Sequence, residues 1–312
     1  MGYYTSQMRI RPISVLIPSE SAQTDINGHV VRAKTAFAQL REEGAYQALE
    51  NQMLVYRIKH QQRDYTGIVL GVDITEFDRN TIIHHELTIP RKVKQQTSVA
   101  LEQGGFSKPI LLTHRPIPII QNIIKEVTTK APLIEVTLKK YKAVHQIWPI
   151  TDPGEVSAIQ DAYLDKQNGY IVDGHHRTAA MKALYNNPDI HINEGLCAMF
   201  DIEQLDILPF HRIVDIAQPI EGVIHNLDDC GRLVELDQPR APSQIGEVII
   251  LSDQRCWSLR WTNIPADKIE KLDVNLFSER ILKDILDIHQ ESTSSRLQYI
   301  EGKYRVDQIQ SM

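Results

Sequence analysis

The chain has few cysteines and no closely spaced pair of them. Its three cysteines are Cys197, Cys230 and Cys256, and none of them forms a CxxC motif. Such spacing excludes the usual cysteine-rich zinc sites and differs from a dense disulfide framework, although it leaves a single bridge open. Three scattered thiols are typical of a protein in a reducing compartment.

Long apolar runs and blocks of one charge are also absent. No uninterrupted apolar stretch reaches the length of a membrane-spanning helix, and no secretory signal pattern is found. The net charge of -6 is spread along the 312 residues without a basic stripe. We therefore expect a soluble cytoplasmic protein that binds no membrane, has no general nucleic-acid-binding surface, and holds any anion in a local site. The sequence leaves the oligomeric state open.

The composition is that of a folded protein. Hydrophobic residues make up 42% of the chain and charged residues 24%, so a substantial core can be buried. Strand and helix patterns both occur, and we expect an α+β (mixed α/β) fold. We expect two units, residues 1–215 and residues 216–312, and find no internal repeat.

Apolar periodicity predicts the order of the elements. Helices are expected at residues 31–49, 119–130, 152–164 and 275–289. Strands are expected at residues 54–59, 66–74, 134–141, 145–150, 196–202 and 207–214, and a hairpin at residues 247–251 and 255–261. The polar residues 61–64 predict a turn that pairs the first two strands.

One short stretch combines an apolar strand, a turn and three side chains that contain nitrogen. It is Tyr170-Ile171-Val172-Asp173-Gly174-His175-His176-Arg177. Residues 178–184 favour a helix, so the Gly-His-His-Arg run is expected on its first turn. Unbonded N–H groups and the helix dipole favour an anion at that position, and Gly174 lets the backbone approach it closely. Asp173 can cap the helix, while Arg177 suits phosphate oxygens. The stretch therefore predicts a phosphate-binding site.

Two other interpretations of this stretch remain open. Asp173 could serve only as a helix cap, with His175 and His176 as ordinary surface residues. A zinc site is less favoured, because adjacent residues on a helix project about 100° apart and no closely spaced cysteine pair is present.

A second candidate stretch could supply a catalytic base. It is Ile82-Ile83-His84-His85-Glu86-Leu87-Thr88. A carboxylate such as Glu86 could orient an attacking hydroxyl and accept its proton, with His85 holding or tuning that carboxylate. Alternatively, Glu86 pairs with a nearby base and the histidines are solvated.

Taken together, these stretches resemble the uncharacterised family known as DUF1015. The order His85-Glu86, then Asp173 to Arg177, then Ile207-Leu208-Pro209-Phe210-His211-Arg212 is similar to that family. Further segments that match it are Ser107-Lys108-Pro109-Ile110, His145-Gln146-Ile147-Trp148 and Lys271-Leu272-Asp273-Val274. The resemblance extends from about residue 50 to the C-terminus.

The same two stretches resemble those of free L-serine kinases, which use ADP or ATP. That resemblance implies a ParB/sulfiredoxin-like catalytic core with additional N- and C-terminal α/β elements. It implies that Glu86 is the catalytic base and that His85, His175 and His176 assist the reaction. By the same resemblance, Asp173 to Arg177 hold the nucleotide phosphates together with Mg²⁺.

Other assignments stay open beside the kinase. His211 and Arg212 are weaker candidates for contacting the substrate. The Pro-Lys-Ser/Thr signature that usually follows in the family is not found, so another small alcohol could replace serine as the acceptor. Two alternative functions are a ParB-like nucleotide-binding regulator without kinase activity and an interaction protein in which the loop is vestigial.

Overall fold

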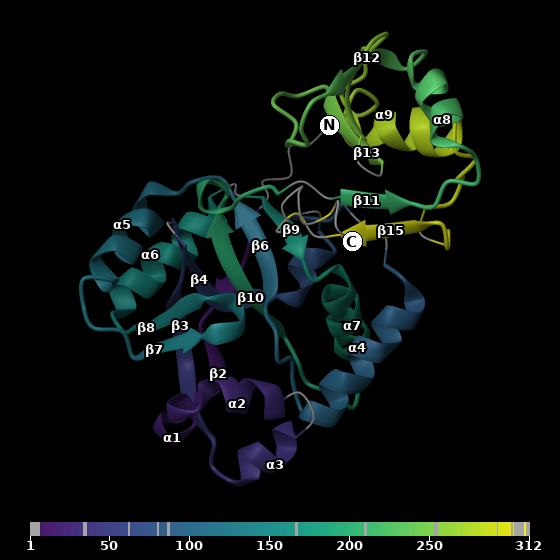
Figure 1. Cartoon of the computed structure of the whole chain (residues 1–312). Coiled ribbons are helices and arrows are strands. Elements are labelled where there is room, and N and C mark those ends of the chain that lie inside the picture. Colours follow the sequence, from purple (N-terminus) through teal and green to yellow (C-terminus); the bar gives the residue numbers. More distant parts are fainter. Residues whose placement is uncertain are drawn as a thin grey trace. The chain divides into compact units, whose positions relative to one another are not determined.

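A computed structural model of the chain describes residues 7–33, 36–61, 63–79, 81–85, 88–165, 168–208, 211–252, 255–291, 293–300, 302 and 309. The chain divides into two compact units, Met1–Asp206 and Ile207–Met312 (Figure 1). The sequence placed this boundary at residue 215. Strand β11 (His211–Val214) pairs with β15 (Leu297–Ile300), and this pairing assigns the residues before 215 to the C-terminal unit.

The N-terminal unit is built on one large mixed sheet. Its main path has the order β5-β9-β6-β10-β4-β3-β8-β7, with β1 added beside β4 and β2 beside β3. Its strands are β1 Ile10–Arg11, β2 Ile13–Pro18, β3 Tyr46–His60, β4 Arg63–Asp73, β5 Ile82–Ile83, β6 Ile110–His114, β7 Ile134–Leu138, β8 Ala143–Ile150, β9 Gly169–Asp173 and β10 Glu194–Asp201. The pairs β5–β9 and β6–β10 are parallel, and the other strand pairs among the described residues of this sheet are antiparallel.

The apolar face of this sheet forms the core of the unit. Val55 of β3 pairs with Ile68 of β4, Ile68 with Met199 of β10, and Met199 with Leu112 of β6. All four side chains are fully buried. Partners across a sheet point to the same side, so the row is continuous over four strands.

Helices cover the sheet. In the N-terminal unit they are α1 Glu20–Thr24, α2 Ile26–Arg32, α3 Phe37–Glu42, α4 Pro90–Gln103, α5 Pro118–Val127, α6 Pro153–Leu164 and α7 His175–Tyr185. Helices α5 and α6 pack against each other and contribute to the core of the sheet. Helices α4 and α7 also pack together, away from that pair (Figure 1).

Several predicted elements are confirmed. The strands expected at residues 54–59 and 66–74 form the antiparallel pair β3–β4, and those expected at 134–141 and 145–150 form β7–β8. Helix α6 begins where the Asp152-Pro153 sequence predicted, and the Asp152 carboxylate accepts a hydrogen bond of 2.7 Å from the Gly154 N–H. An N-cap carboxylate of this kind satisfies a donor that the helix leaves unbonded.

The helix predicted at residues 31–49 is wrong. Helix α2 ends at Arg32, α3 ends at Glu42, and β3 starts at Tyr46. Gly44 has a φ of 74°, which lies outside the right-handed helical region. The residues after it extend because they pair with β2.

The C-terminal unit contains two small sheets and its own core. Its elements are β11, β15, β12 Gly231–Leu236, β13 Glu247–Ser252, β14 Arg255–Trp261, α8 Ile220–Leu227 and α9 Asp273–Leu276. The expected hairpin is confirmed as β13–β14, and β12 completes a three-stranded sheet. The helix predicted at residues 275–289 is shorter in the structure. Helix α9 continues as a π-helix over Phe277–Lys283 and ends there.

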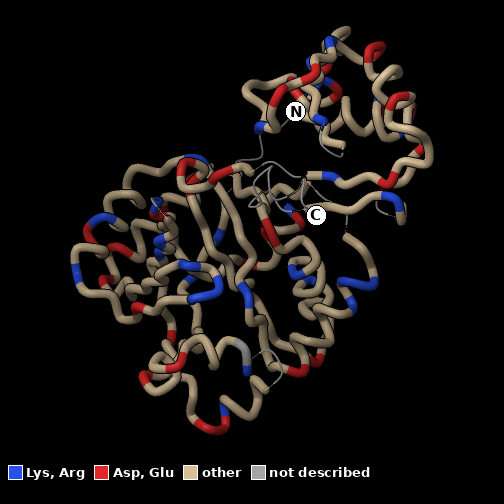
Figure 2. Tube along the Cα trace, viewed as in Figure 1, with Lys and Arg blue, Asp and Glu red and all other residues tan. Residues whose placement is uncertain are grey.

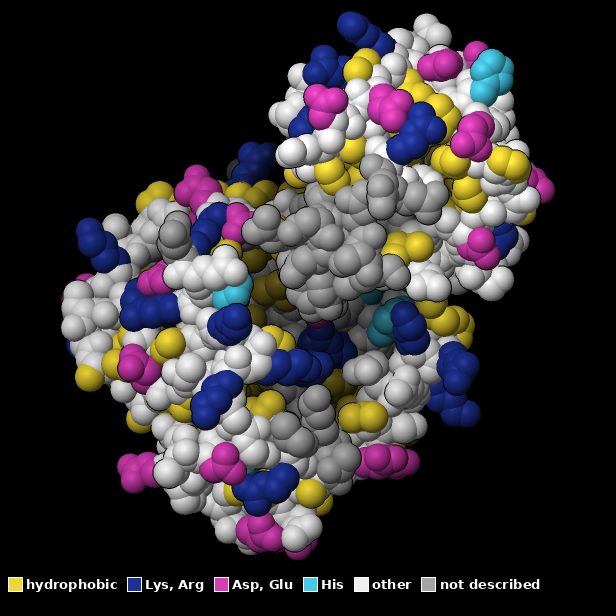
Figure 3. Space-filling view, in the orientation of Figure 1, with side chains coloured by type: hydrophobic (Ala, Val, Ile, Leu, Met, Phe, Trp, Pro, Cys, Tyr) yellow, Lys and Arg dark blue, Asp and Glu magenta, His cyan; other side chains and the backbone are white. Residues whose placement is uncertain are grey.

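The fold is mixed α+β, as the sequence predicted, and its three cysteines are free and buried. Lys, Arg, Asp and Glu are interspersed along both units (Figure 2). On one face, Lys and Arg gather over the middle of the N-terminal unit, with Asp and Glu mostly nearer its margin (Figure 3). Among the described residues, no helix has the length and apolar character needed to cross a bilayer.

Candidate functional site

The predicted phosphate-binding stretch opens into a cavity. The cavity has a volume of about 300 Å³ and lies where β9 ends and α7 begins. Helix α4 supplies two further lining side chains. The lining residues are Lys92, Gln96, Val172, Asp173, Gly174, His175, His176 and Arg177. The stretch from Asp173 to Arg177 therefore surrounds one hollow, next to a basic side chain from another helix.

The backbone at the start of α7 suits an anion. Gly174 occupies the N-cap with a φ of 107°, a conformation that favours glycine, and no side chain caps the helix there. The N–H of Thr178 donates to the Gly174 carbonyl at 2.8 Å. The N–H groups of His176 and Arg177 precede that bond and have no acceptor within the helix. The expectation that Asp173 caps the helix is wrong, because Gly174 holds the cap position.

Arg177 holds the stretch in shape. Its guanidinium donates to the backbone carbonyl of Pro109 and to the carboxylate of Asp173. The Arg177 side chain is only 13% exposed, whereas that of Asp173 is 72% exposed. Pro109 directly precedes β6, so Arg177 ties the start of α7 to two strands of the sheet. We infer that Arg177 positions the loop, while Asp173 presents its carboxylate at the cavity.

The structure brings the two histidine-containing stretches together. The rings of His85 and His175 lie edge to face, with their centroids 4.7 Å apart. Strand β5 pairs parallel with β9 in the register Ile83 to Tyr170, which directs the following residues toward the start of α7. Glu86 itself lies outside the described residues.

The two histidines of the stretch have different surroundings. His175 is buried, and only 6% of it is exposed. His176 is half-buried, and no described residue hydrogen-bonds its buried Nδ1 atom. The Nδ1 atom of His176 is therefore a buried polar atom with no hydrogen-bond partner among the described residues.

Lys92 and Gln96 are site residues that the sequence reasoning missed. Both belong to α4, a helix that was not predicted. The sequence features that indicate this helix are Pro90 in its first turn and Gly104 just after its last turn, residues typical of helix ends. In the structure Gly104 has a φ of 67°. The Lys92 side chain is exposed, and no described carboxylate forms an ion pair with it.

His211 and Arg212 belong to the C-terminal unit, on β11. The Arg212 guanidinium lies over the rings of Phe277 and Tyr299, at 5.2 and 5.5 Å from their centroids. Contacts of this kind stabilise the unit itself. Pro209 and Phe210, which precede them, lie outside the described residues.

The described lining of the cavity does not supply the ligand set of a protein-held zinc site. Within the described ranges, no cluster of three or more His, Cys, Asp or Glu side chains could hold a metal ion. Magnesium is usually held by one or two carboxylates together with the phosphates of a substrate. The exposed carboxylate of Asp173 fits that requirement.

Comparison with known proteins identifies the family. A family profile described as a protein of unknown function (DUF1015) matches residues 11–275. No curated protein and no solved structure matches the chain. The match covers most of both units, from β1 to α9. The chain belongs to the DUF1015 family.

Proposed function

We propose that this protein is a nucleotide-dependent kinase that phosphorylates the hydroxyl group of a small molecule, most directly free L-serine. The observation that carries the proposal is the cavity at the start of α7, where Gly174, unbonded N–H groups and Lys92 converge. Backbone N–H groups at a helix N-terminus and a nearby lysine are recurring features of phosphate-binding sites.

The nucleotide phosphates would occupy this cavity. The N–H groups of His176 and Arg177 would donate to phosphate oxygens, and Lys92 would contribute positive charge from the opposite wall. Arg177 would hold the phosphate-binding loop in place, because its guanidinium bonds to Asp173 and Pro109. ADP and ATP both carry the terminal phosphates that such a cavity selects.

Mg²⁺ would be held by Asp173 and the phosphates, and it would neutralise charge that develops during transfer. Phosphoryl transfer depends mainly on alignment and electrostatic stabilisation, so few side chains need to react. The chain's own contribution is therefore a fixed loop and a base for the acceptor hydroxyl.

Glu86 is the proposed base. By the family resemblance it accepts the proton of the acceptor hydroxyl as that oxygen attacks the terminal phosphorus of the nucleotide. The leaving nucleotide retains the bridging oxygen, so ATP yields ADP and ADP yields AMP. The contact between His85 and His175 supports this assignment, because it places the residue before Glu86 against a residue that lines the phosphate cavity.

The ParB/sulfiredoxin-like catalytic core is part of the same proposal. Its support here is the arrangement of a mixed sheet in which β5 and β9 are neighbours and end beside the helix that carries the phosphate loop.

Nucleotide binding and product analysis test the proposal. We expect ADP or ATP with Mg²⁺ to raise the melting temperature of the full chain, because a ligand that binds only the folded state stabilises it. We expect mass spectrometry to detect a phosphorylated product when L-serine or a panel of small alcohols is added. Protection without any product would favour a nucleotide-binding regulator, and the absence of protection would contradict both functions.

A further inference from the structure

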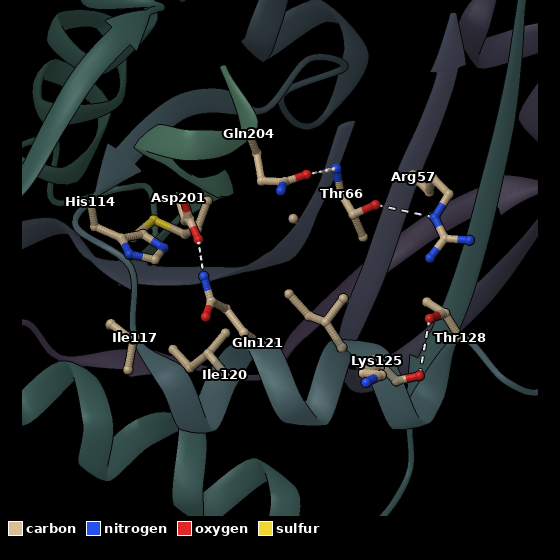
Figure 4. A pocket seen from close by; sticks show the side chains of 13 residues that line it. Arg57, Thr66, His114, Ile117, Ile120, Gln121, Lys125, Thr128, Asp201 and Gln204 are labelled. Carbon is tan, nitrogen blue, oxygen red and sulfur yellow. Dashed lines mark hydrogen bonds between the residues drawn. The ribbon is translucent and has the colours of Figure 1, made fainter. Parts of the chain in front are cut away.

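A second cavity lies between α5 and the sheet, and it shares no lining residue with the phosphate cavity. Its volume is about 320 Å³. The inner surface is lined by Ile117, Ile120, Ile124 and Met199, and polar side chains occupy both ends (Figure 4). An apolar lining with a few polar groups is typical of small-molecule sites.

The polar ends of the cavity arise where the side chains along four strands of the sheet change from apolar to polar. Two residues beyond the buried row described above, the four strands carry Arg57, Thr66, Asp201 and His114 instead of apolar side chains. Arg57 pairs with Thr66, and Asp201 pairs with His114. Positions two residues apart share a face of a sheet, so this polar row faces the same side as the core. The cavity lies where the apolar core ends.

At one end of the cavity the polar groups bond to one another. Asp201 accepts hydrogen bonds of 2.7 Å from the Gln121 side-chain amide and from the N–H of Glu203. His114 contacts the carbonyl of Arg115 at 2.7 Å and the hydroxyl of Tyr163 at 2.9 Å. Because the carbonyl can only accept, Nδ1 of His114 donates to it, and the Tyr163 hydroxyl donates to Nε2. The polar groups at this end therefore form hydrogen bonds within the protein.

The other end presents cationic donors. Arg57 donates from Nε to the Thr66 hydroxyl at 3.1 Å, and its guanidinium lies 5.2 Å from the centroid of the Trp148 ring. These two contacts fix the guanidinium plane while leaving its Nη donors without a described acceptor. Lys125 of α5 is exposed, and in the described part of the chain neither cation has a carboxylate partner. A guanidinium fixed in this way is suited to a planar or tetrahedral anion.

We propose that this cavity binds a small organic anion, with its carboxylate or phosphate head at Arg57 and Lys125 and a short apolar body against the isoleucines. The cavity contains two cations and one carboxylate, Asp201, whose oxygens already accept internal bonds. The positive charges in the cavity therefore outnumber the negative ones, which favours an anionic ligand. The inference rests on this cavity alone and is independent of the proposed kinase activity.

Titration of the full chain with 4-methylpentanoate and with 3-methylbutyl phosphate tests this proposal, and acetate serves as a probe that has a head without an apolar body. We expect saturable binding of at least one of the longer anions, seen as shifts of the backbone amide signals of Arg57, Thr66 and Lys125. The tighter of the two anions identifies the head group. Acetate should bind more weakly, because it leaves the isoleucines uncovered.

Two substitutions separate a built site from a general attraction of anions. Arg57→Gln should weaken binding at least about tenfold, as expected for the loss of charge-assisted hydrogen bonds. Lys59→Gln removes one positive charge from the same strand outside the cavity and should leave the affinity unchanged. If Arg57→Gln lowers the melting temperature strongly, Lys125→Gln on the exposed side of α5 replaces it, with a smaller expected loss.

Failure of both longer anions to bind the folded wild-type chain would overturn the proposal. Equal weakening by Arg57→Gln and Lys59→Gln would also overturn it. Neither result would affect the kinase proposal, since nucleotide protection is measured at the other cavity.

Discussion

The ring of His85 lies edge to face against the ring of His175, with 4.7 Å between their centroids. The two residues are far apart in the sequence, and the parallel pairing of β5 with β9 brings their strands together. Each histidine belongs to one of the two stretches on which the proposed function rests. The contact thus places His85, the residue before the proposed base, against His175, which lines the cavity proposed for the phosphates.

Removing the charge of Lys92 should weaken nucleotide binding with little effect on stability. Lys92 is exposed and lines the phosphate cavity. We expect Lys92→Gln to lower the affinity for ADP or ATP about fivefold, which corresponds to about 1 kcal/mol. Titration calorimetry measures this effect. Lys94→Gln is the matched control, because Lys94 is exposed on the same helix and does not line the cavity. Equal losses in the two variants would argue against a specific role for Lys92.

A side chain at Gly174 should disturb the loop. The φ of 107° is one that other residues rarely adopt, and an added Cβ would lie 3.2 Å from the Arg177 guanidinium carbon. We expect Gly174→Ala to reduce the free energy of unfolding by at least about 1 kcal/mol and to abolish nucleotide protection. Urea unfolding with and without ATP measures both quantities. Full nucleotide protection in this variant would contradict the proposed loop geometry.

Arg177 should affect stability as well as binding. Replacement by alanine leaves the Pro109 carbonyl without its described donor and frees the Asp173 carboxylate. We expect Arg177→Ala to lower the free energy of unfolding by about 2 kcal/mol and to reduce phosphoryl transfer. Arg177→Lys should recover part of the stability and little of the transfer, because lysine lacks the planar fork that spans both partners. Unchanged stability in Arg177→Ala would show that the arginine does not hold the loop.

The C-terminal unit contains a carboxylate whose charge should stabilise it. The Glu247 side chain is completely buried, and it accepts hydrogen bonds from Arg240 at 2.5 and 3.0 Å and from Ser258 at 2.6 Å. The Arg240 bonds, followed by those from Ser258 and Ser243, hold the pKa of Glu247 well below its ordinary value of 4.5. Because the pKa of Glu247 is lower in the folded state, its charge stabilises the fold at pH values above the ordinary pKa of 4.5. That stabilisation is lost as the pH falls from 4.5 toward the lowered pKa.

Glu247→Gln tests this assignment. We expect the variant to lose about 2 kcal/mol of unfolding free energy at neutral pH, because a hydrogen-bonded charge is removed from a buried site. The wild type should approach the variant as the pH falls from about 4.5 toward lower values. Denaturant unfolding across this pH range provides the measurement. A constant difference between the two proteins would mean that the charge of Glu247 does not contribute.

The sequence predicted the local structure of the candidate site better than it predicted which distant residues contact that site. Strand β9 and helix α7 follow directly from the apolar run, the glycine and the helix-forming residues 175–185. The cap was assigned to Asp173 because aspartate is a common N-cap. In the structure its carboxylate contacts Arg177, four residues later, and the positive φ belongs to Gly174.

Long-range features could not be read from local patterns. The contact of Arg177 with Pro109 and the approach of Lys92 depend on how α7 packs against β6 and α4. The second cavity depends on the register of four strands, which aligns Arg57 with Thr66 and Asp201 with His114. Each of those residues alone is an ordinary polar position in a strand. Their common face, next to the core, becomes evident only once the register of the strands is known.

Phosphorus NMR of the purified chain with Mg²⁺, ADP or ATP, and L-serine tests the central claim most directly, with Glu86→Gln measured beside the wild type. We expect a phosphoserine signal that grows with the wild type and is absent with Glu86→Gln, while both proteins shift the nucleotide signals. An equal phosphoserine signal from both proteins would contradict the role of Glu86. Unchanged nucleotide signals and no phosphorylated product with the folded wild type would contradict the kinase itself.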